Sequence, residues 1–416
     1  MQKNKTLLVV GGGAAGFFCA VNAAKWNPQL RVVILEKSGK LLAKVKVSGG
    51  GRCNVTHACF EIPEMTKSYP RGAHFVKKVF HQFFTTDTIE WFKRRGVVLK
   101  TEADGRMFPA NNSSETIVNC LLQEAAKYGV EIRMQTELKK VEKKEGFFYA
   151  HLNGGETLQS DCICIATGGY PKTEMYQWLS DLGHTVQTPV PSLFSFNMPQ
   201  HPITGLTGLS VDDAIVRITG TKLQQRGPVL ITHWGLSGPC TLKLSAWGAR
   251  ELAGRNWQFT ILINWLAPYN EPQLLEAFQG LRFSLARQKM TSKNPFELPK
   301  RLWEFLLETS ALTSETRWAD LNSRQQTALI KNLISYECAV KGKTTFKEEF
   351  VTAGGIHLSE IDANTMMSRK QPNLYFAGEV LDVDGITGGF NFQNAWSTAY
   401  VAAKAIASQT GSLNAS

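Results

Sequence analysis

The hydrophobic positions of this chain follow two spacings, one typical of buried strands and one typical of helices. Near the N-terminus, the apolar run 6–10 contains β-branched residues and predicts a buried parallel strand. Three glycines follow, and the apolar stretch 14–24 then has helical character. A second β-rich run, 31–35, predicts another strand. This order indicates a βαβ unit, the building block of an α/β fold.

Similar patterns continue to about residue 190. Apolar residues recur at helical spacing over 113–127, behind the potential capping residues Ser113–Thr116. Further strands are predicted at 130–134, 138–141 and 147–152, and the stretch 162–169 predicts a buried strand that leads into a glycine turn. We therefore expect a β-meander that returns to the parallel sheet.

The pattern changes near the proline-containing stretch 188–192. Short strand-like runs come first and helical spacing follows; the clearest segments are 209–219, 229–232 and 259–264 for strands, and 295–308 and 323–335 for helices. Strand-like sequence resumes near Phe350, and the clearest later segments are a strand at 373–379 and a closing helix at 395–406.

These changes predict two domains. Residues 1–190 and 345–416 form one discontinuous domain, and residues 191–344 are inserted into it as a substrate domain. Within the insertion, 191–270 is β-rich and 271–344 is mainly helical.

Charge is unevenly distributed along the 416 residues, whose net charge is +11. Between Gly39 and Lys100 there are twelve lysines and arginines but only four acids. A basic block of this density suggests a polyanionic partner such as nucleic acid. In the alternative, some cations neutralise a bound phosphate group and the rest are solvated surface.

Cysteine usage and hydropathy favour a cytoplasmic protein. The eight cysteines are scattered without a CxxC motif, which suits reduced thiols. The apolar run 7–21 after Lys3 and Lys5 resembles a secretory signal or membrane anchor. Its central glycines and its length, short of the roughly 20 residues that a membrane span needs, argue against both. We expect neither membrane contact nor a metal centre.

The first turn carries the clearest chemical motif. Gly11, Gly13 and Gly16 form GxGxxG between the first strand and helix. They permit a tight turn, close approach to a pyrophosphate, and tight helix packing, with the diphosphate at the helix N-terminus. Glu36 ends the second strand, where an acid is expected to bind a ribose hydroxyl. Together these features predict a dinucleotide site.

Two further glycine-rich segments suggest which dinucleotide is bound. They are 48–54 and the C-terminal stretch 377–394. A two-part site suits FAD, with ADP at the βαβ unit and the flavin at a distant loop that leads into a helix. Helix amides near Gly389 would stabilise negative charge on the reduced flavin.

The segments SGGGRCN, ATGG, THWGLSGP, TAGGI and AGEVLDVDGITGGFNFQNA resemble a bacterial flavoprotein family. Its members are described as NAD(P)/FAD-dependent oxidoreductases, aminoacetone oxidase-like or BaiN-like, and include ribosomal RNA dihydrouridine synthase. The resemblance spans the chain. It implies a Rossmann-type FAD-binding domain of the glutathione-reductase-like, two-dinucleotide-binding class, with an inserted β-rich domain and a small helical subdomain.

The resemblance also implies which residues contact FAD. They are Gly11, Gly13, Ala14, Ala15 and Gly16 at the diphosphate; Glu36 and Lys37 at the ribose; Lys44, Ser48, Gly49, Gly50, Gly51, Arg52, Cys53 and Asn54 along the flavin; Leu138 at adenine; Thr167 and Gly168 beside the ADP; Gly378, Glu379 and Asp384 at the ribityl and phosphate region; and Gly388, Gly389, Phe390, Asn391 and Gln393 at the ring. A second GxGxxG is missing, so NAD(P)H remains only a transient electron donor.

The implied chemistry is reduction of an activated carbon–carbon double bond by hydride from flavin N5, with a general acid protonating the neighbouring carbon. The favoured substrate is a uridine in ribosomal RNA, which the basic region 39–100 would help to bind. Two alternatives stay open: an FAD-dependent oxidoreductase or oxidase of a small molecule, and a non-catalytic RNA-associated protein with structural FAD.

His233 and Cys53 are the candidate acids. His233 lies in the THWGLSGP segment, and histidine titrates near neutral pH; the alternative is a histidine that only positions backbone. Cys53 beside the flavin loop either donates a proton or simply packs. Five residues separate Cys53 from Cys59, one more than in a CxxxxC redox pair. Arg106 either binds a substrate anion or orders its loop.

Overall fold

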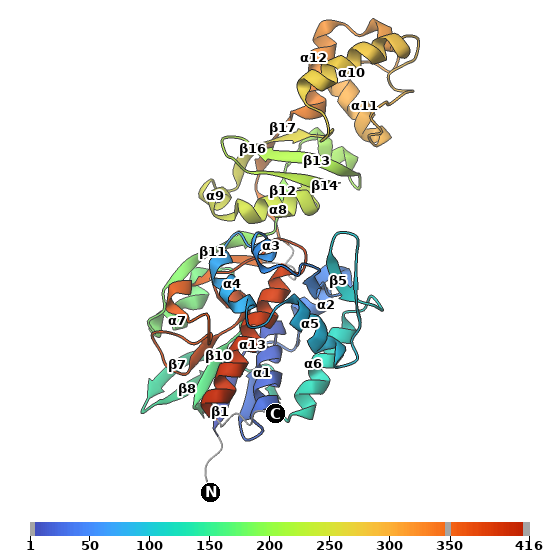
Figure 1. Cartoon of the computed structure of the whole chain (residues 1–416). Helices are drawn as coiled ribbons and strands as arrows, with labels where there is room; N and C mark the ends of the chain where they lie inside the picture. The colour runs from blue at the N-terminus through green and yellow to red at the C-terminus, as the bar shows by residue number, and fades with distance from the viewer. Residues whose placement is uncertain (1–4, 346–350, 411–416) are drawn as a thin grey trace. The chain divides into compact units, whose positions relative to one another are not determined.

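The computed structural model describes residues 5–345 and 351–410 (Figure 1). The chain divides into two compact units, Met1–Ser192 with Lys347–Ser416, and Leu193–Phe346. These bounds lie two residues from those expected from the sequence. Each unit has its own hydrophobic core. That the second unit binds substrate stays a prediction.

The centre of the first unit is a five-stranded parallel sheet. Its strand order is β20-β10-β1-β2-β6, with β1 at Thr6–Val10, β2 at Arg31–Leu35, β6 at Glu131–Arg133, β10 at Cys162–Ile165 and β20 at Leu374–Phe376. The residues of β10 are all buried, which explains their continuous apolar pattern. The expected α/β class is therefore confirmed.

Two helices that are far apart in sequence pack side by side on this sheet. They are α1 (Ala14–Trp26) and α13 (Phe390–Thr410) (Figure 1). Phe18 and Trp396 meet between them, with ring centroids 5.2 Å apart. The helix expected at 395–406 in fact begins at Phe390. The prediction started too late because the first turn of α13 contains polar residues. The buried Gln393 belongs to this turn and is satisfied by side-chain hydrogen bonds, so a polar residue there does not interrupt the buried face.

Short helices fill the basic region, for which the sequence predicted no secondary structure. They are α2 (Ala43–Gly51), α3 (Ile62–Thr66), α4 (Ala73–Phe80) and α5 (Thr85–Lys93). Strands that lie between and after these helices in the sequence form a small sheet of order β3-β5-β4, with β3 at Thr56–His57, β4 at Leu99–Thr101 and β5 at Arg106–Pro109.

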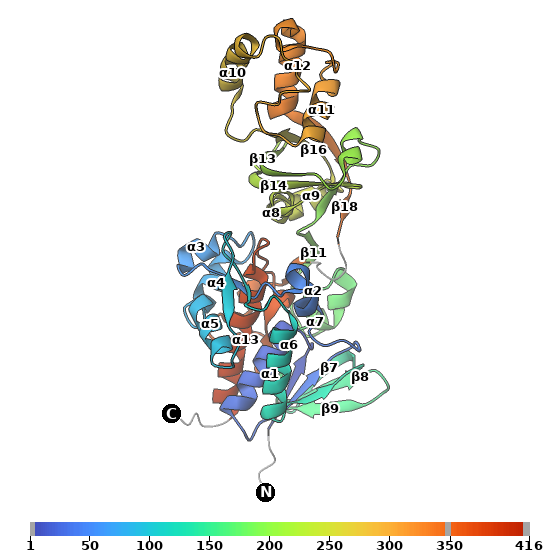
Figure 2. The same cartoon turned by 90° about the vertical axis from the view of Figure 1, so that its right-hand side faces the viewer.

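The predicted helix at 113–127 and the meander are present. Helix α6 spans Glu115–Lys127, and the antiparallel strands β7 (Leu138–Lys144), β8 (Phe147–Leu152) and β9 (Thr157–Ser160) lie side by side (Figure 2). The capping prediction is only partly right. The Ser114 side chain makes no capping bond and donates instead to the Lys46 carbonyl, while Ser113 accepts from the Glu115 amide.

The remaining elements of the first unit follow the meander and flank β20. They are η1 (Thr173–Tyr176), α7 (Gln177–Asp181), η4 (Leu358–Glu360), η5 (Gly378–Val380), and the antiparallel pair β11 (Val186–Ser192) and β19 (Val351–Ile356). Phe350, near which strand-like sequence was expected to resume, lies outside the described residues.

The second unit is built on a seven-stranded antiparallel sheet of order β17-β16-β13-β14-β15-β12-β18. The strands are β12 (Ser195–Asn197), β13 (Ser210–Ile218), β14 (Gln224–Thr232), β15 (Gly235–Ser237), β16 (Gln258–Asn264), β17 (Tyr336–Lys341) and β18 (Lys343–Thr344). Residues 271–344 were expected to be mainly helical, and β17 is a strand that follows the helices of this stretch. Its residues alternate strictly between buried and exposed, the period of a strand.

Helices complete the second unit. They are η2 (Pro202–Leu206), α8 (Pro239–Trp247), α9 (Ala249–Gly254), α10 (Glu271–Ser284), α11 (Lys300–Thr309), η3 (Trp318–Asp320) and α12 (Ser323–Ile334). The helix expected from residue 295 begins only at Lys300. Proline at 299 occupies the N-cap, and Glu297 has a left-handed backbone, so the preceding residues do not continue the helix.

Among the described residues, we find no helix with the length and apolar character needed to cross a membrane.

Candidate functional site

The predicted cofactor residues gather at one edge of the parallel sheet. Since the strands are parallel, the carboxyl ends of β1, β2, β10 and β20 lie at the same edge. These ends lead into the glycine loop 11–16, Glu36, residues 167–168 and residues 378–379. In open α/β sheets, ligands bind outside this edge.

The glycines of the first loop face different surroundings. A Cβ on Gly11 would collide with the Ala166 carbonyl, and one on Gly16 with the Gly11 carbonyl. A Cβ on Gly13 would meet nothing within 4 Å. Packing of the protein therefore requires Gly11 and Gly16, whereas Gly13 leaves open space in front of the backbone.

Helix α1 presents its N-terminus to this space. Gly13 is its N-cap, no side chain caps the helix, and its first turn contains no acidic residue. The first backbone amides of a helix have no partner inside the helix, and the helix dipole favours an anion there. These amides are suited to a diphosphate.

The carboxylate of Glu36 lies beside the same loop. It accepts hydrogen bonds from the Gly12 amide (2.8 Å) and from the Ser38 amide (2.8 Å) and hydroxyl (2.7 Å). Glu36 is half-buried, so its acceptor lone pairs are oriented by the protein but remain within reach of a ligand hydroxyl.

The second glycine segment contacts the C-terminal loop. Helix α2 is kinked at 48–50. With its amide oriented to satisfy both groups, Asn54 accepts from the Gly389 amide at 2.9 Å and donates to the Thr56 carbonyl at 3.1 Å. The Thr56 hydroxyl donates to the Gln393 side chain (2.6 Å). The structure thus brings together two predicted flavin segments that are more than 300 residues apart.

His57 extends this junction, although no motif in the sequence singles it out. Its Nδ1 lies 3.0 Å from the Gly388 carbonyl oxygen, and its ring stacks on Phe390 with centroids 4.7 Å apart. Because a carbonyl only accepts, Nδ1 carries the proton. Proximity to the SGGGRCN segment was the only signal in the sequence.

A further junction is formed by Lys44 and Glu379, both predicted cofactor residues. The Lys44 ammonium lies 2.7 Å from the Glu379 carboxylate, whose other oxygen accepts from the Thr352 amide at 2.9 Å. The Thr352 hydroxyl is buried without a partner in the described part of the chain, as is the side-chain oxygen of Asn394.

These features fit FAD. Besides Gly13, the predicted contact residues Gly50 and Gly168 have nothing within 4 Å of a Cβ, so a ligand can approach their backbone. The open space, the uncapped helix N-terminus and the orphaned polar atoms of Thr352 and Asn394 are what a bound dinucleotide would use.

Several predicted contact residues have side chains turned into the protein, and three of them are polar or reactive. Asp384 is fully buried, ion-paired with Arg71 and bonded to the Ser192 hydroxyl (2.8 Å). Gln393 is equally buried and its amide group has protein partners. Cys53 is fully buried, and burial raises the pKa of its thiol to about 12. Side-chain contact with FAD does not agree with this burial, so these three residues support the loops.

Three further predicted cofactor residues are accessible to different degrees. Lys37 is exposed, with its ammonium 5.5 Å from the Tyr170 ring centroid, whereas Leu138, at the start of β7, and Thr167 are half-buried. Direct contact of these residues with FAD stays a prediction.

The candidate acid His233 lies in the second unit. It occupies the turn between β14 and β15, is exposed, and packs edge-on against Trp234 with ring centroids 4.4 Å apart. An exposed imidazole can exchange a proton, whereas the buried Cys53 thiol cannot reach a substrate without a structural change. His233 is therefore the better candidate, and its catalytic role stays a prediction.

The other candidate residues are either held in ion pairs or poorly reactive. Arg106 forms ion pairs with Asp104 (2.6 Å) and Glu102 (3.1 Å), which favours its loop-ordering role. Cys53 and Cys59 are both free thiols, and burial raises the pKa of Cys59 as well. Raised thiol pKa values do not suit a thiolate-based redox pair.

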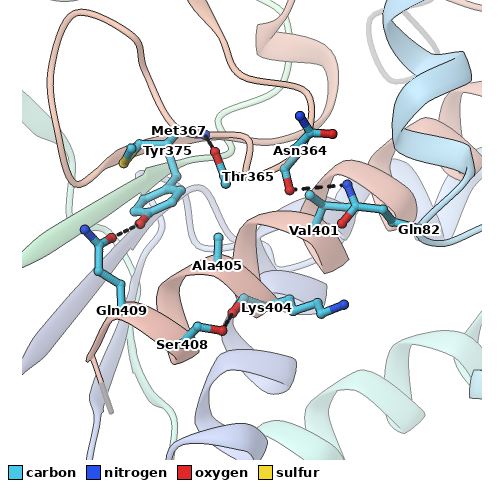
Figure 3. A pocket seen from close by; sticks show the side chains of 10 residues that line it. All are labelled: Gln82, Asn364, Thr365, Met367, Tyr375, Val401, Lys404, Ala405, Ser408 and Gln409. Carbon is cyan, nitrogen blue, oxygen red and sulfur yellow. Dashed lines mark hydrogen bonds between the residues drawn. The ribbon is translucent and has the colours of Figure 1, made fainter. Parts of the chain in front are cut away.

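An open cavity of about 430 Å³ lies elsewhere in the first unit (Figure 3). Tyr375 donates to Gln409 at its wall, and Gln82 donates to the Asn364 carbonyl at 3.2 Å. Lys404 is its only charged lining residue, and no predicted cofactor residue lines it. It is not the candidate site.

Comparisons with known proteins agree with this geometry. The family model described as HI0933-like protein Rossmann domain matches residues 5–405. The chain is 31% identical to ribosomal RNA dihydrouridine synthase of Escherichia coli (strain K12), over 95% of this chain and 96% of the relative. It is 26% identical to 3-dehydro-bile acid delta(4,6)-reductase of Clostridium scindens, over 96% and 98%.

A solved structure supports the fold. The 3-ketosteroid-delta4-(5alpha)-dehydrogenase of Rhodococcus jostii RHA1 matches with a TM-score of 0.51 and 12% identity, over 97% of this chain and 98% of that one.

Proposed function

The chain belongs to the HI0933-like Rossmann family and is an FAD-dependent oxidoreductase; from this premise we propose that it reduces a uridine in ribosomal RNA to dihydrouridine. The observation that carries the proposal is the assembled FAD site, in a chain that is similar over nearly its whole length to a ribosomal RNA dihydrouridine synthase.

Two of the relatives are named for reactions of the same type. Dihydrouridine is uridine with its C5–C6 double bond saturated, and that bond is conjugated with a ring carbonyl. A delta(4,6)-reductase of a 3-dehydro-bile acid also acts on double bonds conjugated with a carbonyl. The common chemistry is hydride addition to one carbon and protonation of its neighbour.

Bound FAD would supply the hydride. The chain's own residues bind and orient the cofactor: the amides at the start of α1 hold the diphosphate and Glu36 accepts from the ribose. Asn54 and His57 hold the Gly388–Phe390 loop in place. His233 donates the proton to the substrate carbon.

RNA binding is assigned to part of the basic region. Arg71 and Arg95 are not available, since they are nearly buried in ion pairs with Asp384 and Glu124. Helix α4 instead exposes the cations Lys77 and Lys78, and the imidazoles of His74 and His81, its C-cap residue, are exposed as well. Residues three or four apart share a helix face, so these side chains form one basic face, which we call the α4 face.

Mapping of dihydrouridine in ribosomal RNA tests the proposal. RNA from cells with and without the gene is compared by mass spectrometry, and one dihydrouridine is expected to disappear without the gene. It should return with the wild-type gene and not with the Gly13→Val variant. Identical maps with and without the gene would exclude the proposed substrate.

A small molecule is the second candidate, favoured by the bile acid reductase among the relatives. Reduced protein would then be re-oxidised by a steroid with a carbonyl-conjugated double bond and not by a ribosomal RNA fragment. In either case NAD(P)H acts as a transient electron donor. Bleaching of the flavin absorbance on addition of NAD(P)H under anaerobic conditions tests this role.

A further inference from the structure

The second unit carries an unusually exposed aromatic side chain. Phe283, near the C-terminal end of α10, is 90% exposed, the highest value among the exposed large hydrophobic side chains of the described residues. Leu274 and Phe278 of the same helix are fully buried in the core of the unit. Phe283 contributes to neither that core nor the residues packed against it. Folding of the unit therefore gives no reason for an aromatic residue here.

The sequence around Phe283 is strongly basic. From residue 277 to 296 there are four cations and no carboxylate: Arg282, Arg287, Lys289 and Lys293. Neither core packing nor solubility explains an apolar side chain that lies exposed among cations. It suggests a ligand that is both aromatic and anionic.

The fold adds an arginine from a second segment. The amides of Trp318 and Ala319 donate to the carbonyls of Gln288 and Ala286, both at 3.1 Å, which places Arg317 beside this segment. Arg282 donates to the Gln326 side chain of α12 at 3.4 Å. The resulting arginine cluster is Arg282, Arg287 and Arg317.

These arginines form no ion pair among the described residues. Lys289, and to a smaller extent Arg317, lower the pKa of Glu315, whose carboxylate pairs with Lys289 at 2.7 Å. Within residues 5–345 and 351–410, none of the three arginines takes part in an ion pair. Arg287 and Arg317 are exposed.

We propose that Phe283 and the arginine cluster bind unpaired nucleotides of RNA. Phe283 stacks on a base, and the guanidinium groups contact the flanking phosphates. Every base has an aromatic face, and arginine combines bidentate phosphate binding with stacking, so this combination suits single-stranded RNA. The inference rests on the proposed function for the nature of the ligand, and it adds a second RNA-binding surface.

Charge favours RNA over a second copy of the chain as the occupant. In a twofold-symmetric dimer, the same patch contacts itself. The three arginines of one protomer would then face the three arginines of the other, and like charges across an interface are destabilising.

RNA affinity of the FAD-loaded full chain tests the proposal. The probe is a fluorescein-labelled single-stranded RNA of about 20 nucleotides, followed by anisotropy, with the duplex of the same sequence as comparison. Phe283→Ala should weaken binding of the single strand about tenfold, a typical loss for one stacked base. Phe283→Trp should retain the affinity.

Two further variants sharpen the test. Phe60→Ala removes another exposed phenylalanine, on the first unit, and should leave the affinity unchanged. Arg287→Glu with Arg317→Glu should weaken binding and flatten its dependence on salt, because fewer counterions are released. Since all these side chains are exposed, the unfolding midpoint should not change.

Unchanged RNA affinity in Phe283→Ala would overturn the proposal. If this variant instead turned a dimer into a monomer at unchanged affinity, the surface would be a subunit interface. If the chain bound RNA through Phe283 while deletion of the gene left the dihydrouridine map unchanged, the proposed function would be wrong and this surface would stand. A changed map with full affinity of Phe283→Ala would overturn only this surface.

Discussion

At the scale of single residues, Gly13 differs from its neighbours because protein packing does not require it. A Cβ there meets no atom within 4 Å, and no left-handed backbone angle is needed. Gly13→Val should therefore fold, while its side chain fills the space in front of the α1 amides. We expect FAD affinity to fall at least tenfold, measured as flavin absorbance per chain after gel filtration.

Gly16→Val is the matched comparison. Its Cβ would collide with the Gly11 carbonyl, so this variant should lose folded structure together with FAD, as far-UV circular dichroism would reveal. Full FAD occupancy in Gly13→Val would mean that the diphosphate does not bind this loop.

A second residue-scale prediction concerns proton delivery. His233→Ala should keep its FAD and its flavin reduction but slow re-oxidation by substrate by about 10²–10⁴-fold, the usual effect of removing a positioned acid. Cys53→Ala should leave this rate near that of the wild type, because the thiol is fully buried and its pKa is raised to about 12. Anaerobic stopped-flow absorbance measures both rates. The opposite pattern would assign the proton to the thiol.

At the scale of elements, the α4 face is expected to bind RNA phosphates. Lys77→Glu with Lys78→Glu should lower RNA affinity and reduce the slope of log affinity against log salt by about 2, since each lost phosphate contact removes nearly one released counterion. FAD content should not change. Filter binding at several salt concentrations measures the slope.

Lys139→Glu with Lys140→Glu on β7 gives the same change of net charge at another exposed site. If this pair weakened RNA binding as strongly, the effect would come from net charge and not from the α4 face.

A buried polar cluster links segments of the first unit and makes its stability sensitive to acid. His184 donates from Nδ1 to Glu360 (2.9 Å) and approaches the Ser368 hydroxyl with Nε2 (3.1 Å). Lys370 contacts the other Glu360 oxygen at 2.6 Å. Although the hydrogen bonds of this cluster join a serine, a histidine and a carboxylate, the Ser368 side chain cannot reach a substrate, because the residue is only 2% exposed.

Burial alone would raise the pKa of Glu360, but hydrogen bonds from Lys370 and Thr185 lower it to about 2. A lowered carboxyl pKa gives stability that is present above the unfolded value and is lost as pH falls toward 2. The lowering of the Glu360 pKa from 4.5 to about 2 corresponds to about 3 kcal/mol of unfolding free energy that is lost in acid. Burial also lowers the pKa of His184, so its contribution is lost in the same direction, beginning below about 6.5.

Urea unfolding of the first unit between pH 7 and 2 measures this loss. Glu360→Gln should be less stable at pH 7 and should lose less stability between pH 4 and 2 than the wild type. Parallel curves for the two proteins would contradict the assignment of the acid sensitivity to Glu360.

At the scale of the whole molecule, each unit has its own core, and all predicted FAD contacts lie in the first unit. Removal of FAD should therefore lower the unfolding temperature of the first unit alone. A ligand at roughly a hundredfold its Kd stabilises by about 2.7 kcal/mol. Differential scanning calorimetry of the full chain, with and without FAD, which we expect to bind non-covalently at one site per chain, measures the shift. An equal shift of both transitions would show that FAD also stabilises the second unit.

The sequence by itself determined the features that depend on short stretches of chain. The βαβ unit, the glycine loop and Glu36 follow from local periodicity and from backbone freedom at Gly11. The two-part division of the chain also left a local signal, because composition changes on both sides of the insertion. The α/β class and the FAD-dependent oxidoreductase family were predictable for this reason.

Only the tertiary structure decided which side chains are free to act. The sequence suggested Arg95 as part of the basic region and Asp384 as an FAD contact, yet partners 29 and 313 residues away bury both side chains in ion pairs. His57 became a candidate only through its contact with Gly388, 331 residues away. Burial and ion pairing depend on contacts between distant segments, and a local pattern carries no information about which segments will meet.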